Sequence, residues 1–188
     1  NEDLGQLANI FTNLKKNTLP LAALGIPEKV VNSNVKWRSP SSDFCKKIAE
    51  FSKKFSTKNP YKFLKILCEG DGSKRLPIKL PKDGEPVFFP KTDTVISVIG
   101  LSCLGKPIKE TLFRYELLPN LTSLDNYFIK SLQSADIVTT DFLYRLCLSE
   151  KGLRKNITSQ KFCIIFNQAD ILDEKALAEV ITLRNQLQ

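Results

Sequence analysis

The sequence contains no histidine and no methionine. Histidine is the side chain that most often acts as a general base near neutral pH, so any hydrolysis would depend on carboxylates, backbone donors, a metal ion or a positioned water. The sequence therefore identifies no catalytic residue. Because position 1 is an asparagine, we expect that residue 1 is not the natural start of the protein.

The five cysteines are odd in number, and none of them forms a Cys-x-x-Cys pair. Most lie inside apolar runs, which predicts buried free thiols in a reducing compartment. Without histidine, a zinc site would need thiolates from distant segments, so no zinc site is expected. The chain also lacks the ~18-residue apolar run of a membrane span, and its acidic first residues are unlike a secretory signal. These absences predict a cytoplasmic protein without a membrane partner.

Positive charge is abundant and unevenly distributed. The net charge is +8, and the segment 41–82 holds eleven Lys and Arg residues against four Asp and Glu. This excess suits a nucleotide, another anion or an acidic protein partner. The alternative is a solvated helix face, which is the better interpretation of the lysines in 46–54. No RNA-binding signature accompanies the interleaved aromatic residues, so nucleic acid is the weakest candidate partner.

The spacing of apolar residues, together with the proline-containing segments between the apolar runs, predicts an α/β fold. We expect one domain over 1–188, with a mainly parallel sheet flanked by helices, because buried strands alternate with helical segments. Helical spacing of apolar residues predicts helices over 3–15, 39–56 (with Ser41 or Ser42 as N-cap), 122–134, 140–149 and 173–187. Apolar runs predict strands over 63–69 and from residue 160 onward, and a run rich in β-branched residues predicts a strand over 92–100. The expected non-regular segments are 17–40 and a long functional or docking loop at 70–91.

The stretch EGDGS, which begins at Glu69, is the first candidate site. Ligands of parallel α/β sheets bind at the carboxyl ends of strands, and Glu69 ends a predicted strand. Glu69, Asp71 and Ser73 offer oxygen ligands for Mg²⁺, while Gly70 and Gly72 let backbone amides approach a phosphate. Glu69-x-x-Gly72 has the spacing of the Asp-x-x-Gly turn of GTP-binding proteins. The alternative is an ordinary Asp-Gly turn.

A second candidate site is the stretch NQAD, which begins at Asn167. It resembles the Asn-Lys-x-Asp guanine-recognition motif, in which the carboxylate accepts from guanine N1–H and the exocyclic amine while Asn braces the loop. Gln168 stands where that motif has Lys. The alternative is that Asn167 caps the strand and Asp170 or Asp173 caps the last helix. The two stretches support each other because both follow predicted strands, in the chain order of a GTP-binding protein.

The wider context of the first stretch resembles a known family. Residues 69–116 are similar to the signature of the selenium-dependent hydroxylase accessory proteins of the YqeC type, and the resemblance covers roughly 63–175. Gly70 replaces an Ala of that signature, Phe113 replaces the His before Arg114, and the upstream part differs. The matching residues are Glu69, Asp71, Gly72, Ser73, Leu76, Pro77, Lys79, Pro81, Glu85, Pro86, Pro90, Gly100, Leu101, Gly105, Pro107, Arg114 and Glu116.

The resemblance implies a P-loop nucleotide-binding protein that acts in maturation or cofactor supply of selenium-dependent molybdenum hydroxylases. It implies GTP or another nucleotide with Mg²⁺ as ligand, and a hydroxylase client or its cofactor as partner. The family carries a Gly-Gly-Lys-Thr loop near its N-terminus, which cradles phosphates. This chain contains no Gly-Lys-Ser or Gly-Lys-Thr. We therefore expect the strand–P-loop–helix unit to be missing from it, and nucleoside triphosphatase activity only if a P-loop lies upstream.

The resemblance also implies roles for individual residues. Glu69 and Asp71 would organise Mg²⁺ and water near the γ-phosphate. The nucleotide-binding set is Asp71, Gly72, Ser73, Lys74, Asn167 and Asp170. The docking or anion-binding set is Arg75, Lys79 and Arg114. The alternative function is a non-catalytic binding or scaffold module that docks a client enzyme through the basic loop 74–91.

Overall fold

The computed structural model describes residues 26–31, 34–38, 40–58, 66–89, 91–121 and 136–188. The chain divides into two compact units, the first made of Asn1–Cys68 with Phe89–Lys91 and the second of Glu69–Phe88 with Thr92–Gln188. The expectation of a single domain over 1–188 stays a prediction. The helices expected over 3–15 and 122–134 lie outside the described residues.

The first unit contains a β-hairpin. β1 (Ile26–Val31) pairs antiparallel with β2 (Asn34–Arg38), and the register shifts between Pro27 and Lys29. The expectation that 17–40 is irregular is therefore wrong for these strands. β1 is rich in β-branched residues, and a proline is tolerated at a bulge because no ladder donor is needed there.

α2 (Ser42–Lys58) confirms the helix expected over 39–56. Its N-cap is Ser41, whose Oγ accepts a hydrogen bond from the backbone N–H of Phe44 at 3.2 Å. Phe44, Cys45 and Ile48 are buried on one face. The lysines at 46, 47, 53 and 54 are exposed, which confirms the solvated-face interpretation of this basic segment.

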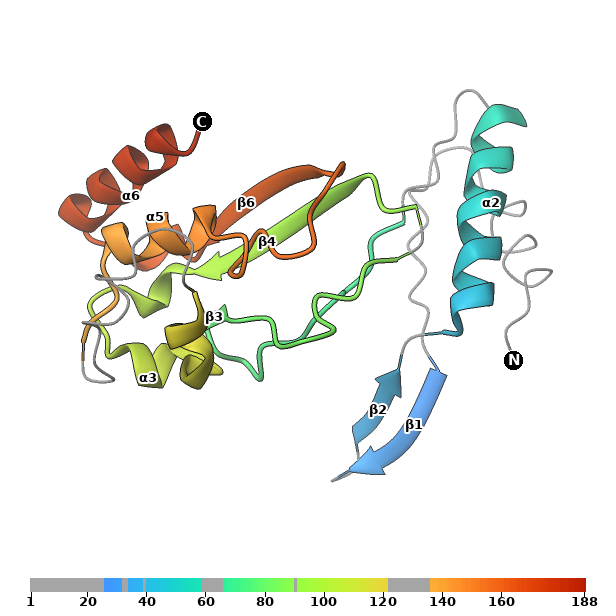
Figure 1. Ribbon diagram of the computed structural model, residues 1–188, viewed down its shortest axis with the longest axis horizontal. Helices are drawn as coiled ribbons and strands as arrows, with labels where there is room; N and C mark the ends of the chain where they lie inside the picture. The colour runs from blue at the N-terminus through green and yellow to red at the C-terminus, as the bar shows by residue number, and fades with distance from the viewer. Residues whose placement is uncertain (1–25, 32–33, 39, 59–65, 90, 122–135) are drawn as a thin grey trace. The chain divides into compact units, whose positions relative to one another are not determined.

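Two parallel strand pairs organise the second unit (Figure 1). β4 (Thr94–Gly100) and β6 (Lys161–Asn167) pair along their whole lengths, so that Gly100 lies opposite Asn167. β3 (Ile78–Lys79) pairs in parallel with β5 (Leu112–Phe113). These pairs confirm the strands expected in 92–100 and from residue 160, and they confirm an α/β class. Parallel pairing also brings the carboxyl ends of β4 and β6 to one edge.

Two capped helices confirm the helices expected at 140–149 and 173–187. α5 (Thr140–Leu148) begins after Thr139, whose Oγ1 accepts from the N–H of Phe142 at 3.1 Å. α6 (Glu174–Gln186) begins after Asp173, whose Oδ1 accepts from the N–H of Ala176 at 2.8 Å. Asp173 is therefore the helix cap, which leaves Asp170 without that role. Shorter elements complete the unit: η1 (Leu101–Cys103), α3 (Ile108–Thr111), η2 (Tyr115–Asn120) and η3 (Ala169–Ile171).

A single apolar cluster forms the core of the second unit. Ile78 and Leu80 belong to it together with buried residues of β4, η1, β5, α5 and α6. Since side chains alternate along an extended segment, Lys79 between them points to the other side. Cys103 and Cys147 are buried in this core, and burial raises the pKa of their thiols to about 11 and about 12. Cys68 and Cys163 are exposed, which corrects the expectation for these two thiols.

Residues 66–69 form no strand, although 63–69 was expected to be one. The side chain of Leu67 is 88% exposed and that of Ile66 is 38% exposed. A strand needs a neighbour for its backbone groups, and 66–69 has no strand partner among the described residues. Residues 63–65 lie outside the described part. No described helix combines the length and apolar character that crossing a membrane demands.

Candidate functional site

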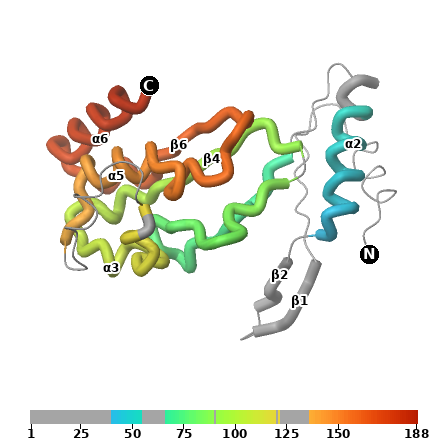
Figure 2. The backbone as a smooth tube through the Cα atoms, viewed as in Figure 1, coloured from blue at the N-terminus to red at the C-terminus, as the bar shows by residue number. Residues whose placement is uncertain are grey.

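The first candidate stretch opens a loop that runs out and back around β3. Figure 2 shows its outgoing and returning segments side by side, and a Cβ added at Gly70 would lie 3.0 Å from the carbonyl oxygen of Val87. Within the outgoing segment, the N–H of Leu76 donates to the carbonyl of Ser73 at 3.0 Å. The loop expected over 70–91 is thus present, interrupted by the short strand β3.

The outgoing segment of this loop contains a tight turn with two basic residues at its centre. Lys74 and Arg75 have φ of 52° and 66°, so both are left-handed, as in a type I′ turn. Asn and Gly usually fill such positions because a Cβ is strained there. Both side chains are exposed, and within the described residues neither is paired with a carboxylate. The turn therefore presents two cations to solvent.

A cluster of four alternating charges lies behind the turn. Lys79 Nζ forms ion pairs with Asp71 Oδ1 and, at 2.9 Å, with Glu85 Oε2. Arg114 donates from both guanidinium nitrogens to Glu85, and Nη2 lies 3.0 Å from Oε1. The side chains of Lys79, Glu85 and Arg114 are 10%, 16% and 15% exposed. We call Asp71, Lys79, Glu85 and Arg114 the charge cluster.

The two carboxylates of the charge cluster differ in their electrostatics. The guanidinium of Arg114 holds the pKa of Glu85 far below its usual range, with help from Lys79. Burial raises the pKa of Asp71, and the nearby charge of Glu85 adds to this effect, so that Lys79 compensates only in part. Glu85 in turn raises the pKa of Arg114. The charge cluster therefore favours the ionised form of Glu85 and disfavours the ionised form of Asp71.

Phe113 connects the turn to the charge cluster. Its ring centre lies 4.8 Å from Cζ of Arg114, 5.0 Å from Nζ of Lys74 and 5.7 Å from Nζ of Lys79. Cations are attracted to the face of an aromatic ring at such distances. Arg114 has a φ of 65°, which turns the chain immediately after β5. Three cations thus lie around one partly buried aromatic ring.

The returning part of the loop is held by the turn that precedes β6. Lys155 Nζ donates to the carbonyl of Lys82 at 2.8 Å and lies 3.6 Å from Asp83 Oδ1. Asn156 Nδ2 donates to the carbonyl of Glu85 at 3.3 Å. These contacts join residues more than seventy positions apart in the chain. They fix the position of Glu85 within the charge cluster.

The second candidate stretch lies at the shared edge of β4 and β6. Gly100 ends β4, and its N–H donates to the carbonyl of Pro77 at 2.9 Å. A Cβ at Gly100 would lie 2.9 Å from Oε1 of Gln168 and 3.1 Å from Cβ of Pro77. Asn167 and Asp170 are exposed at this edge, and Gln168 has a φ of 66°. Gly100 therefore lies against Pro77, four residues after the first candidate stretch in the same loop, and against Gln168 of the second candidate stretch.

Some of the predicted site residues are brought together and others are not. Asp71, Lys79 and Arg114 meet in the charge cluster, and Lys74 joins them through Phe113. Glu69, Gly72 and Arg75 are exposed and Ser73 is partly buried, all on the same loop. Among described residues, no hydrogen bond or ion pair joins Asn167 or Asp170 to the charge cluster. No group of three potential metal ligands was found within these residues.

Comparison with known families decides the relationship of this chain. The sequence profile described as YqeC protein matches residues 11–116, more than half of the chain. The chain belongs to the YqeC protein family. No curated protein and no solved structure matches it.

The YqeC match includes the whole charge cluster and the basic turn. It also includes residues from 11 onward, upstream of the segment on which the resemblance was based. From the sequence, Glu85 and Phe113 stood out only as matching or departing positions, and Lys155 and Asn156 lay within the resemblance over 63–175 without any expected role. The sequence did offer an indication that Glu85 forms ion pairs, because it is an acidic residue in a loop where basic residues outnumber acidic ones.

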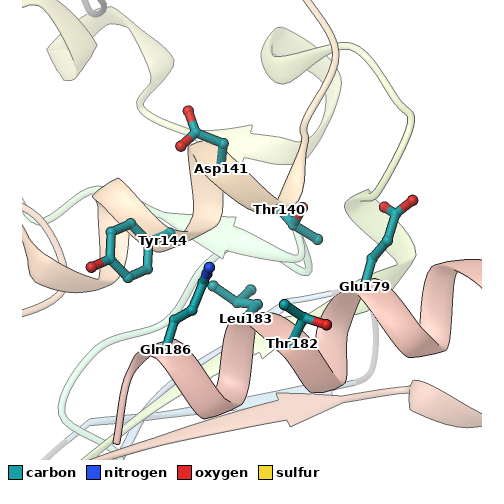
Figure 3. Close-up of a pocket in the computed structure, with 7 residues that line it drawn as sticks. All are labelled: Thr140, Asp141, Tyr144, Glu179, Thr182, Leu183 and Gln186. Carbon is teal, nitrogen blue, oxygen red and sulfur yellow. The ribbon is translucent and has the colours of Figure 1, made fainter.

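A separate cavity of this YqeC family member lies between α5 and α6 (Figure 3). It has a volume of about 540 Å³ and is open to solvent. None of the predicted site residues lines it. Its lining residues are Thr140, Asp141, Tyr144, Glu179, Thr182, Leu183 and Gln186. The lining is mixed in polarity, without the convergent charges that the first loop provides.

Proposed function

We propose that this protein is an accessory protein that binds a guanine nucleotide and acts in maturation or cofactor supply of selenium-dependent molybdenum hydroxylases. Membership of the YqeC family supports the accessory role. The proposal of nucleotide binding is carried by one observation. Gly100, at the carboxyl end of β4, contacts both the loop that carries Asp71 and the segment that carries Asp170. Ligands of parallel α/β sheets bind at such edges.

The first loop would hold the phosphates and Mg²⁺. Lys74 and Arg75 offer cations at an exposed turn, and Glu69 and Asp71 offer the oxygen ligands that Mg²⁺ prefers. Asp71 is paired with Lys79 in the described structure, so Mg²⁺ would have to take its carboxylate from that lysine. Mg²⁺ binding and release of Lys79 would then be coupled.

The second stretch would select the base. Asp170 is exposed and is not needed as a helix cap, so its carboxylate is free to accept from guanine N1–H and from the exocyclic amine. Adenine offers neither donor in these places. Asn167 would brace the loop, while Gln168 contacts the end of β4 in the place of the motif's lysine.

The test is a competition titration of Mg²⁺-bound guanosine, adenosine and xanthosine triphosphates on the wild-type protein and on Asp170→Asn. The wild type should prefer guanine. Asp170→Asn should prefer xanthine, because xanthine carries a carbonyl where guanine carries the amine. One charge-assisted hydrogen bond is worth about 1.5–3 kcal/mol, so the preference should change by about tenfold or more.

Asp173→Asn is the matched control for this titration. It removes the same charge nearby, and asparagine still caps α6, so its base preference should equal that of the wild type. If the protein binds no nucleotide, or if Asp170→Asn and Asp173→Asn have the same preference, the nucleotide proposal is wrong.

A second candidate function is a non-catalytic module that docks a client enzyme through loop 74–91. The observation that favours it is that Lys155, Asn156 and Arg114 hold this loop by hydrogen bonds while Lys82 and Val87 stay exposed. A purified molybdenum hydroxylase should then bind the wild type in the absence of nucleotide. Reversing the charge of Lys82 should weaken that binding, whereas Asp170→Asn should leave it unchanged.

A further inference from the structure

Lys79 forms ion pairs with two carboxylates, and one of them, Glu85, also accepts hydrogen bonds from a second cation. Glu85 accepts two hydrogen bonds from Arg114, so it keeps a cationic partner if Lys79 leaves. Asp71 forms an ion pair with Lys79 alone among the described residues. Of the two contacts that Lys79 makes, the one with Asp71 is therefore the one that can be exchanged.

Asp71 is also the most exposed member of the charge cluster. Its side chain is 22% exposed, the largest value in the cluster. Burial and the charge of Glu85 disfavour its ionised form, which raises its pKa. Gly72 follows it, and a Cβ at Gly72 would meet nothing closer than 3.7 Å, whereas Gly70 before it packs tightly against the carbonyl of Val87. The backbone has room to adjust on the Gly72 side of Asp71.

Lys74, which forms no ion pair among the described residues, lies close to the exchangeable contact. Lys74 and Lys79 share the ring of Phe113, at 5.0 and 5.7 Å from its centre. Lys74 and Arg75 keep left-handed backbone conformations that cost stability, and strain of this kind concentrates at functional sites. A carboxylate and a phosphoryl group offer lysine the same acceptor oxygens.

We propose that Lys74, Arg75 and Lys79 form a binding site for a phosphoryl group, and that the Asp71 carboxylate occupies this site in the unliganded protein until the ligand displaces it. The inference rests on the proposed function in that both place phosphate at this loop. It adds that Asp71 opposes phosphate binding when metal is absent and supports binding only when Mg²⁺ takes up its carboxylate.

The test is isothermal titration of inorganic pyrophosphate into the metal-free protein in the presence of EDTA. Asp71→Asn should bind pyrophosphate about tenfold more tightly than the wild type, which corresponds to ~1.4 kcal/mol. In the presence of Mg²⁺, the same variant should bind Mg²⁺–GTP more weakly than the wild type. The double variant Lys74→Gln/Arg75→Gln should bind pyrophosphate about fivefold more weakly, and its exposed positions should leave the fold unchanged.

Asp83→Asn is the matched control. It makes the same change of charge in the same loop, but Asp83 is fully exposed and pairs with Lys155 instead of Lys79. Its affinity for pyrophosphate should equal that of the wild type. The inference is overturned if Asp71→Asn and Asp83→Asn bind equally, if no form binds pyrophosphate, or if the double variant binds as the wild type does. The metal-free titration needs no nucleotide, so it can succeed where the guanine titration fails.

Discussion

Replacing Glu85 by glutamine should lower the stability of the whole second unit. Glu85 accepts two hydrogen bonds from Arg114 and one from Lys79, and all three side chains are mostly buried. Glutamine keeps the shape and one acceptor oxygen but removes the charge. Charge-assisted hydrogen bonds contribute about 1.5–3 kcal/mol each to stability, and neutral ones contribute about 1 kcal/mol. Because these side chains are partly exposed, we expect Glu85→Gln to lower the free energy of unfolding by about 2 kcal/mol.

The buried cysteines provide the assay. Cys103 and Cys147 share the core with Ile78 and Leu80, which flank Lys79, so opening of this region exposes their thiols. When reclosing outpaces labelling, the labelling rate follows the open fraction, and ~2 kcal/mol raises that fraction about thirtyfold. Labelling should be read peptide by peptide in mass spectrometry, because Cys68 and Cys163 are exposed and react in the native state.

Asp83→Asn again serves as the control. Its carboxylate is fully exposed and lies 3.6 Å from Lys155, and an ion pair in open solvent contributes little to stability. Labelling of Cys103 in Glu85→Gln at the wild-type rate would refute the reasoning. Equal acceleration in both variants would show that net charge, and not the charge cluster, stabilises this unit.

Two further predictions concern pH and packing. Since Arg114 lowers the folded-state pKa of Glu85 below its ordinary value of 4.5, the stabilisation is present above that value. It should be lost progressively as the pH falls below about 5, and Glu85→Gln should flatten this loss in acid unfolding followed by circular dichroism. Gly100→Ala should destabilise the protein by about 1–2 kcal/mol in the thiol-labelling assay, because its Cβ would crowd Pro77 and Gln168. Wild-type stability of Gly100→Ala would mean that the end of β4 does not pack tightly against Pro77 and Gln168.

Local signals in the sequence were enough to determine several elements. α2, α5 and α6 follow apolar residues at helical spacing, and their caps Ser41, Thr139 and Asp173 bond within the next three residues. β4 and β6 follow β-branched runs of ordinary strand length. Such features depend on neighbours in the chain, so pattern and propensity describe them well. The family was also identifiable from the sequence, because the loop signature is long and unusual in composition.

Only the tertiary structure decided how the site is assembled. Arg114 lies 29 positions from Glu85, and Lys155 lies 73 positions from Lys82, so no local pattern indicates that they meet. The same limit explains why 66–69 was wrongly predicted as a strand, since an apolar run does not say whether a neighbouring strand will pair with it. Asp71 and Lys79 were expected to bind Mg²⁺ and an anion separately, whereas the fold pairs them with each other. Burial makes that pairing favourable, because a charge removed from water needs a partner of opposite sign.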